Sequence, residues 1–246
     1  MAPRGFSVEP LPWDQFRQWF AQEIKPGQHG AIVSPTGSGK TVLAGGLLDL
    51  RRYVLAVDPK GGDSSLEALG YERLSTWPGT RRMAAKVKQN DENNRPSRYV
   101  VGPKVLRADD VEELGNTIRE TLRGAYELGG FTVYIDELQL ATDPRLGINV
   151  RKEVDQMLIA ARDRGLSCWT SYQSPAWVTP HASRMATWMA VSYTRDREAI
   201  RTLAGNLGRP FSEVAGMIAG LDPYAFAFIT RDPKAPVRVT IADYLG

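Results

Sequence analysis

The 246-residue sequence contains one cysteine, Cys168, and two histidines. A single thiol excludes an internal disulfide framework, so a reducing compartment is the simple interpretation. Cys168 lies in the apolar run Leu-Ser-Cys-Trp, which is typical of a buried side chain. The shortage of cysteine and histidine also argues against a structural zinc site.

Long hydrophobic runs are missing as well. No apolar stretch approaches the roughly 20 residues that a bilayer-spanning helix needs. Residues 1–10 lack the apolar core of a signal peptide. We therefore expect no membrane insertion and a cytoplasmic location, which would be the host cytoplasm for a viral protein.

An excess of one charge sign is also missing, because 31 Lys and Arg stand against 28 Asp and Glu, a net charge of +3. This weakly basic balance is compatible with a nucleic acid or another anionic partner, but does not by itself predict one. The length suits one large α/β domain.

The segment 31–41, Ala-Ile-Val-Ser-Pro-Thr-Gly-Ser-Gly-Lys-Thr, is the most informative part of the sequence. A short apolar strand leads into a small-residue loop that ends at the start of a helix. Backbone N–H groups of such a loop wrap a polyphosphate, and the helix N-terminus adds its dipole. Lys40 would reach the β- and γ-phosphates of a nucleotide, and the Thr41 hydroxyl would bind Mg²⁺.

This phosphate loop has one departure from the usual pattern, since Ser34 stands where a glycine opens it. The turn keeps Gly37 and Gly39, so we expect it to form. The predicted nucleotide-binding residues are Ser34, Pro35, Thr36, Gly37, Ser38, Gly39, Lys40, Thr41 and Val42.

The order of elements predicts the fold class. We expect an N-terminal arm and helix over 1–27, with aromatic residues at 13, 16, 19 and 20 on a face packed on the core. An ATPase domain follows over 28–246, with a basic loop inserted at 81–98 and a short αβ tail after 195. Strands that alternate with helices predict a mostly parallel sheet covered by helices on both faces.

Two carboxylates, Asp136 and Glu137, end the apolar strand that begins at Thr132. An aspartate there suits the outer shell of a Mg²⁺ ion beside a phosphate loop. The glutamate after it can activate a water for attack on the γ-phosphate. Together with the phosphate loop, this pair favours a nucleotide hydrolase over a small-molecule kinase.

A third cluster of candidates surrounds the strand at 166–172. Gln173 would sit at the carboxyl edge of the sheet, where it could bond the γ-phosphate and the attacking water. Arg162 and Arg164 precede this strand, and in a ring of subunits such an arginine could reach a neighbour's nucleotide. Arg162 is favoured slightly, and three other arginines stay open for that role: Arg145, Arg195 and Arg197.

These motifs together resemble the FtsK–HerA superfamily of DNA-pumping ATPases. The matching segments are SPTGSGKT at 34–41, VLAVDPKGG at 54–62, TVYIDE at 132–137 and ARDRGLSCWTSYQSP at 161–175. They span a RecA-like core from about residue 28 to 194. The resemblance implies a pentameric or hexameric ring that hydrolyses ATP with Mg²⁺ and moves duplex DNA through its channel.

Elements of larger relatives are missing from the sequence: transmembrane helices, a winged-helix reader, an N-terminal barrel and a nuclease domain. The resemblance is therefore greatest to bacteriophage genome-packaging ATPases, which dock on a capsid portal. Two alternatives stay open. One is a coupling ATPase of a conjugative or mobile element, which would bind secretion-complex proteins, and the other is a nucleotide-dependent switch that moves nothing.

Contact with DNA would come from basic side chains that grip phosphates without reading sequence. The candidates are Lys60, Arg81, Arg82, Lys86 and Lys88. For any single one of them, a solvated surface charge is the simpler interpretation.

Overall fold

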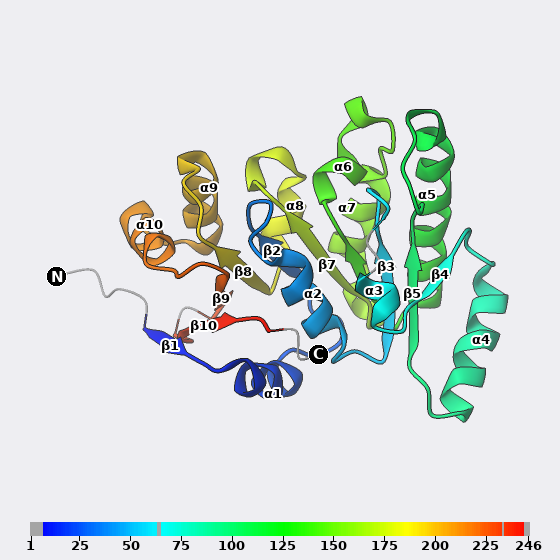
Figure 1. Cartoon of the computed structure of the whole chain (residues 1–246), viewed down its shortest axis with the longest axis horizontal. Coiled ribbons are helices and arrows are strands. Elements are labelled where there is room, and N and C mark those ends of the chain that lie inside the picture. Colours follow the sequence, from blue (N-terminus) through cyan, green and yellow to red (C-terminus); the bar gives the residue numbers. More distant parts are fainter. Residues whose placement is uncertain (1–6, 63–64, 233, 244–246) are drawn as a thin grey trace.

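The computed structural model describes residues 7–62, 65–232 and 234–243, which include a ten-stranded sheet in the order β1-β10-β9-β8-β2-β7-β6-β3-β5-β4 (Figure 1). The strands are β1 Val8–Pro10, β2 Gly30–Val33, β3 Tyr53–Val57, β4 Glu72–Leu74, β5 Ser97–Val101, β6 Thr132–Ile135, β7 Ser167–Tyr172, β8 Trp188–Ser192, β9 Ala225–Thr230 and β10 Val237–Ile241.

The sheet is mostly parallel, as predicted. The seven strands from β8 to β4 in spatial order pair in parallel, whereas β9 runs antiparallel to both β8 and β10. The carboxyl ends of the parallel strands therefore meet at one edge, where open α/β sheets bind their ligands.

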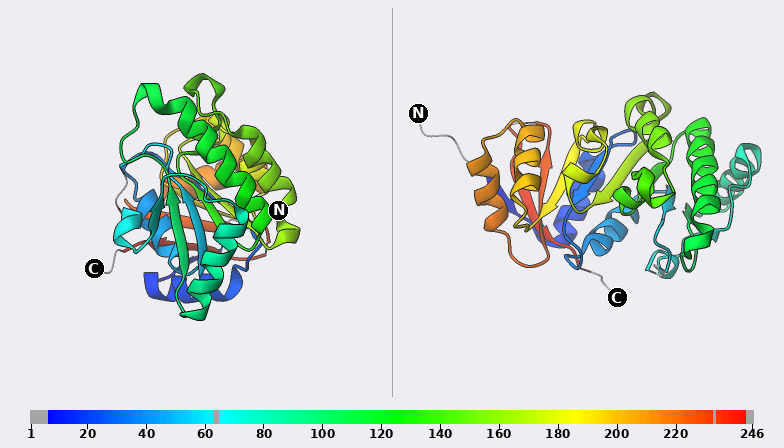
Figure 2. Two further views of the ribbon diagram at one scale, coloured as in Figure 1. Left: turned by 90° about the vertical axis from the view of Figure 1, so that its right-hand side faces the viewer. Right: turned by 90° about the horizontal axis from the view of Figure 1, so that it is seen from above.

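Helices cover both faces of the sheet (Figure 2). They are α1 Trp13–Glu23, α2 Lys40–Leu48, α3 Ser65–Ala68, α4 Thr80–Glu92, α5 Val111–Leu128, α6 Leu138–Thr142, α7 Arg151–Ala160, α8 Pro180–Arg184, α9 Arg197–Leu207 and α10 Phe211–Ala219. Within the described part of the chain, none of them combines the length and apolarity of a membrane-crossing helix.

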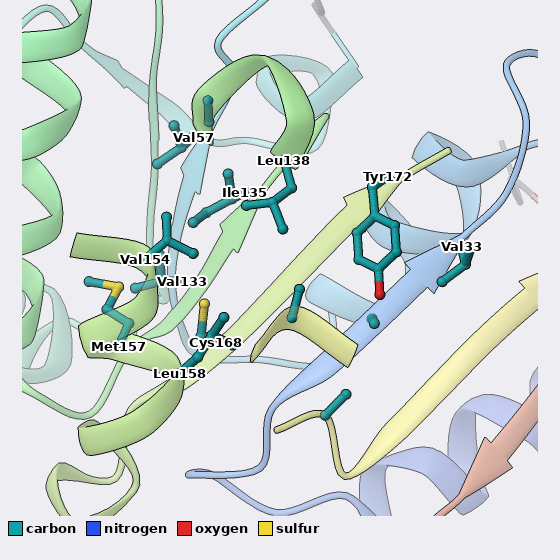
Figure 3. Packing of buried hydrophobic residues seen from close by; sticks show 14 of the residues in the cluster. Val33, Val57, Val133, Ile135, Leu138, Val154, Met157, Leu158, Cys168 and Tyr172 are labelled. Carbon is teal, nitrogen blue, oxygen red and sulfur yellow. The ribbon is translucent and has the colours of Figure 1, made fainter. Parts of the chain in front are cut away.

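Alternate residues along the strands feed two separate hydrophobic clusters. In β2, Ala31 and Val33 join the cluster beneath α4 to α10, while Ile32 faces the cluster beneath α1 to α3. This alternation follows from the period-two geometry of a strand that is buried on both faces. Figure 3 shows the first cluster, where Met157 of α7 packs near Cys168 of β7. Cys168 is fully buried, as its apolar neighbours predicted.

The N-terminal aromatic residues are part of the core, as predicted. Phe16 and Phe20 are fully buried and pack against rings of the sheet, among them Phe228 of β9. A Cβ added to Gly46 would lie 2.4 Å from the Trp13 ring. The glycine of α2 thus permits close approach of α1 to α2.

The predicted basic loop at 81–98 is wrong. Residues Thr80–Glu92 form α4, and β5 begins at Ser97. The helix was missed because its composition is strongly polar and Met83 is its one buried residue, so few apolar side chains mark its inner face. Similarly, Val8–Pro10 of the expected arm pairs with β10 as a strand, while residues 1–6 lie outside the described chain.

The core also buries a titratable group, His29, just before β2. Its Nδ1 accepts a hydrogen bond of 2.9 Å from the Cys168 backbone N–H. Burial, helped by the charge of Arg162, lowers the His29 pKa from 6.5 to about 4. The folded state thus binds this proton less readily than the unfolded chain, and stability falls as the pH drops from 6.5 towards 4.

We expect His29→Asn to flatten this acid dependence, because the amide oxygen can still accept from Cys168 and does not titrate. Urea unfolding at pH 7 and pH 5 should show the wild type losing about 2 kcal/mol more than the variant over this interval. His181→Asn, which removes the other histidine, serves as the control. Identical pH dependence in wild type and His29→Asn would contradict the assignment.

Candidate active site

The phosphate loop joins β2 to α2 at the carboxyl edge of the sheet. Gly37 and Gly39 adopt φ values of +77° and +90°, which favour glycine. The helix begins at Lys40, so Thr41 and Val42 occupy its first turn and Pro35 and Thr36 lie in the turn before it. The loop therefore leads into a helix N-terminus, which is the local geometry that binds anions.

Ser34 explains how the loop forms without an opening glycine. Its side chain is buried and its hydroxyl contacts the hydroxyls of Ser38 and Ser192. The Ser38 hydroxyl also donates to the Pro35 carbonyl at 2.6 Å. The serine thus ties the loop to the end of β8.

Lys40 points back into the loop. Its Nζ donates to the carbonyls of Ser34 and Pro35 at 2.9 and 3.0 Å. Burial of the ammonium group lowers the Lys40 pKa, and the nearby charges of Glu137 and Asp136 oppose that effect. The lysine charge is thus desolvated and lies near both acidic residues.

Asp136 follows β6 and is fixed through one oxygen. Its Oδ1 accepts hydrogen bonds from the Ser171 hydroxyl at 2.5 Å and the Tyr134 hydroxyl at 2.9 Å. Ser171 lies on β7, the strand beside β6. The carboxylate is therefore held in one orientation at the edge where the phosphate loop lies.

The oxygen groups at this edge of the sheet fit a magnesium ion. The Thr41 hydroxyl and the Asp136 carboxylate are hard oxygen ligands, and Mg²⁺ characteristically takes one or two of these together with phosphate and water. Among the described residues there is no group of three or more His, Cys, Asp and Glu that could form an all-protein metal site.

Glu137 adopts a left-handed backbone, with φ of +43°, and its side chain is buried. Its Oε2 pairs with the Lys60 Nζ at 2.6 Å, and its Oε1 accepts from the Gln173 amide at 3.0 Å. Its backbone N–H donates to Ser171 at 3.2 Å. The structure thus brings together Glu137 and Gln173, two residues that the sequence placed in the same site.

Lys60, which the sequence offered as a DNA contact, lies in this site. It follows β3, which is the neighbour of β6 in the sheet. Burial of its ammonium group lowers its pKa, but the hydrogen bond and charge of Glu137 outweigh that, so the net shift is upward. Its ammonium group is therefore held in the charged form beside Glu137.

The candidate arginines lie in different places. Arg162 and Arg164 precede β7, at the edge opposite the phosphate loop and roughly 20 Å from it, the length of a six-residue strand. Arg164 also contacts the Glu127 carbonyl and the Tyr126 ring. Arg145 pairs with Asp143, Arg197 begins α9, and Arg195 lies beside the loop. Neither Arg162 nor Arg164 is placed to reach the phosphate loop of its own chain.

The remaining DNA candidates lie on α4 rather than on a loop. Lys86 pairs with Glu72 and lies 5.3 Å from the centre of the Tyr99 ring, so it is a structural contact. Lys88 is exposed beside Glu92 at 3.9 Å. Arg81 and Arg82 are exposed in the first turn of α4. Arg81, Arg82 and Lys88 are therefore the exposed members of the α4 residues expected to contact DNA.

Sequence reasoning missed several residues at this edge. Ser171 and Tyr134 orient Asp136, and two exposed tyrosines, Tyr193 and Tyr224, lie beside the phosphate loop. Tyr193 follows β8 and Tyr224 precedes β9, so their proximity depends on the antiparallel pairing of these strands. The signal available in the sequence was the position of each tyrosine at a strand end.

No protein-family model and no curated protein matches the sequence. Solved structures do match. The genome-packaging NTPase B204 of Sulfolobus turreted icosahedral virus 2, in complex with AMPPCP, has a TM-score of 0.59 and 18% identity. That match covers 88% of this chain and 98% of B204.

Two further structures belong to other systems. The pCW3 conjugation coupling protein TcpA with ATPγS gives a TM-score of 0.52 at 18% identity, over 89% of this chain and 61% of that one. VirB4 of Thermoanaerobacter pseudethanolicus gives 0.60 at 10% identity, over 88% and 90% of the two chains. All three structures share the fold of this chain, so the predicted resemblance is confirmed at the level of the fold.

Proposed function

We propose that this chain is an ATP-hydrolysing ring motor that translocates double-stranded DNA and packages a viral genome in the host cytoplasm. The observation that carries the proposal is the contact of Glu137 with both Lys60 and Gln173 beside Lys40. A buried carboxylate held next to a phosphate loop can take a proton from an attacking water.

The residues have distinct roles in this proposal. Lys40 exchanges the loop carbonyls for the β- and γ-phosphates of ATP, and the loop N–H groups bind the remaining oxygens. Thr41 and Asp136 would hold Mg²⁺, which neutralises phosphate charge. Glu137 accepts the proton from water, because a carboxylate has lone pairs left after its bonds to Lys60 and Gln173. Gln173 connects the base to the γ-phosphate.

In a ring, an adjacent copy would bring a further arginine to the nucleotide. Arg162 and Arg164 lie at the far edge of the sheet, so we propose that one of them acts on the nucleotide of an adjacent copy, with Arg162 favoured. An arginine provided in this way stabilises the charge that develops during phosphoryl transfer. Arg81 and Arg82 are the proposed DNA contacts, since both are exposed on α4.

The comparison with B204 supports the packaging proposal, because a genome-packaging NTPase shares the fold over 88% of this chain. A coupling role remains the second candidate, because TcpA and VirB4 share the fold. Binding to a capsid portal would support packaging, and binding to a secretion complex would support coupling.

The test is steady-state ATP hydrolysis with and without linear duplex DNA, using Glu137→Gln as the blank. We expect DNA to accelerate phosphate release and the acceleration to fade as salt rises, because phosphate contacts release counterions. Slow hydrolysis that DNA leaves unchanged, also in the presence of candidate docking proteins, would contradict a motor and favour a switch.

A further inference from the structure

The phosphate loop has two different sides. The strand order places β7, β6 and β3 on one side of β2, and these strands carry Gln173, Asp136 and Lys60 at their ends. The other side has β8 and β9, which carry Tyr193 and Tyr224 at the same edge. Between these tyrosines and the phosphate loop is a cavity of about 470 Å³.

The two sides of the phosphate loop can be related to the two ends of a nucleotide. The triphosphate and the base are at opposite ends of an elongated molecule. If the γ-phosphate lies toward Glu137, the base has to leave the loop on the side of β8 and β9. The cavity there lies in the range of small-molecule pockets, about 300–1,000 Å³. It is lined by Thr36 and Gly37 of the loop together with the two tyrosines.

Tyr224 has features that core packing does not explain. The residue is 61% exposed, so burial contributes little to keeping it there. Its backbone has a φ of +64°, in the left-handed region that bulky residues seldom adopt. A Cβ built on Gly39 would lie 3.7 Å from its Cδ1, so the ring lies against the phosphate loop.

The other left-handed residues strengthen this point. Among the described non-glycine residues, φ is positive at Asn94, Glu137, Asn149 and Tyr224. Asparagine tolerates this conformation, whereas glutamate and tyrosine do so less readily. Glu137 and Tyr224 are therefore the unusual members, and both lie at the edge that carries the phosphate loop. Strained backbone of this kind is concentrated at ligand sites.

Tyr193 is held in place by Arg195, which also lines the cavity. Its hydroxyl accepts a hydrogen bond of 2.8 Å from the Arg195 Nε, and the residue is 40% exposed. Arg195 also lines the cavity, where its guanidinium offers donors to a ribose or a base. The pocket thus combines two aromatic surfaces with one cationic group.

We propose that Tyr193 and Tyr224 bind the purine base of the nucleotide by stacking, an inference that rests on the proposed nucleotide-binding function. Stacking depends on ring area rather than on the hydrogen-bonding edge of the base. The pocket therefore distinguishes purine from pyrimidine nucleotides, and distinguishes ATP from GTP only weakly.

The test measures binding of ATPγS and of inorganic tripolyphosphate to the full chain by calorimetry. Tyr224→Asn removes the ring but tolerates the left-handed backbone, and Tyr224→Phe keeps the ring as the matched control. We expect Tyr224→Asn to weaken ATPγS binding about tenfold and to leave tripolyphosphate binding unchanged. Tyr224→Phe should bind both ligands like the wild type.

Thermal unfolding separates a binding role from a structural one. Tyr224→Asn should unfold at a temperature no lower than the wild type, because an exposed ring is lost and backbone strain is relieved. Equal ATPγS affinity in Tyr224→Asn and wild type overturns the pocket, as does an equal loss for tripolyphosphate. Equal wild-type affinity for CTP and ATP also overturns it.

The binding results that would overturn the proposed function differ from those that would overturn the pocket alone. A wild-type chain that binds neither ATPγS nor tripolyphosphate overturns the nucleotide-binding function and the pocket with it. A wild-type chain that binds both, with no effect of Tyr224→Asn, overturns the pocket alone.

Discussion

Glu137→Gln is expected to lower the rate of ATP hydrolysis by about 10²–10⁴-fold, the usual contribution of a general base. The amide has nearly the same shape as the carboxylate, and its oxygen can still accept from Lys60 or Gln173. It cannot take a proton from water. Phosphate release should therefore fall while the affinity for ATPγS stays close to the wild-type value.

The chain offers a matched control in Glu153→Gln. Glu153 is 6% exposed against 5% for Glu137, and it pairs with Arg123 at 2.8 Å. It lies on α7, away from the phosphate loop, so loss of its charge should leave hydrolysis per folded molecule unchanged. Hydrolysis by Glu137→Gln at the rate of this control would refute the role of Glu137 as the base.

The contacts of Glu137 also show which parts of the site a sequence can predict. The phosphate loop is one short run of residues and the Asp136–Glu137 pair is another. Each can therefore be recognised from a few neighbouring residues. Lys60 and Glu137 are 77 residues apart, and they meet because β3 and β6 are neighbours in the sheet. The order of strands is a tertiary property, which is why Lys60 looked like a surface charge.

The same reason applies to the tyrosines, whereas α4 was missed for a different one. Tyr193 and Tyr224 come together only through the antiparallel pairing of β8 with β9. The sequence predicted a short αβ tail after residue 195 but not its pairing with the strand that precedes Tyr193. In α4 the structure buries Met83 and leaves its other side chains exposed or partly exposed. The helix is therefore rich in polar residues, and this composition suggested a loop. Strands buried on both faces were predicted well, because their apolar runs are continuous.

Lys40→Met is expected to weaken the binding of ATPγS about 100-fold, because two charge-assisted contacts with phosphates are lost at about 1.5 kcal/mol or more each. Methionine keeps the apolar stem in the buried position and removes only the charge. The effect should be as large for tripolyphosphate as for ATPγS, since the lysine acts on the phosphates. Calorimetric titration of both ligands measures this directly.

The sign of the stability change separates a ligand contact from a structural one. Burial already disfavours the Lys40 charge, as its lowered pKa indicates, so removing that charge relieves a desolvation cost. The Pro35 carbonyl keeps the Ser38 hydroxyl as a donor. Lys40→Met should therefore unfold at a temperature close to that of the wild type while losing its ligand. Lys152→Met, at an exposed position of α7, should change neither property. A variant that loses binding only in proportion to a loss of folded protein would show that Lys40 supports the loop rather than the phosphates.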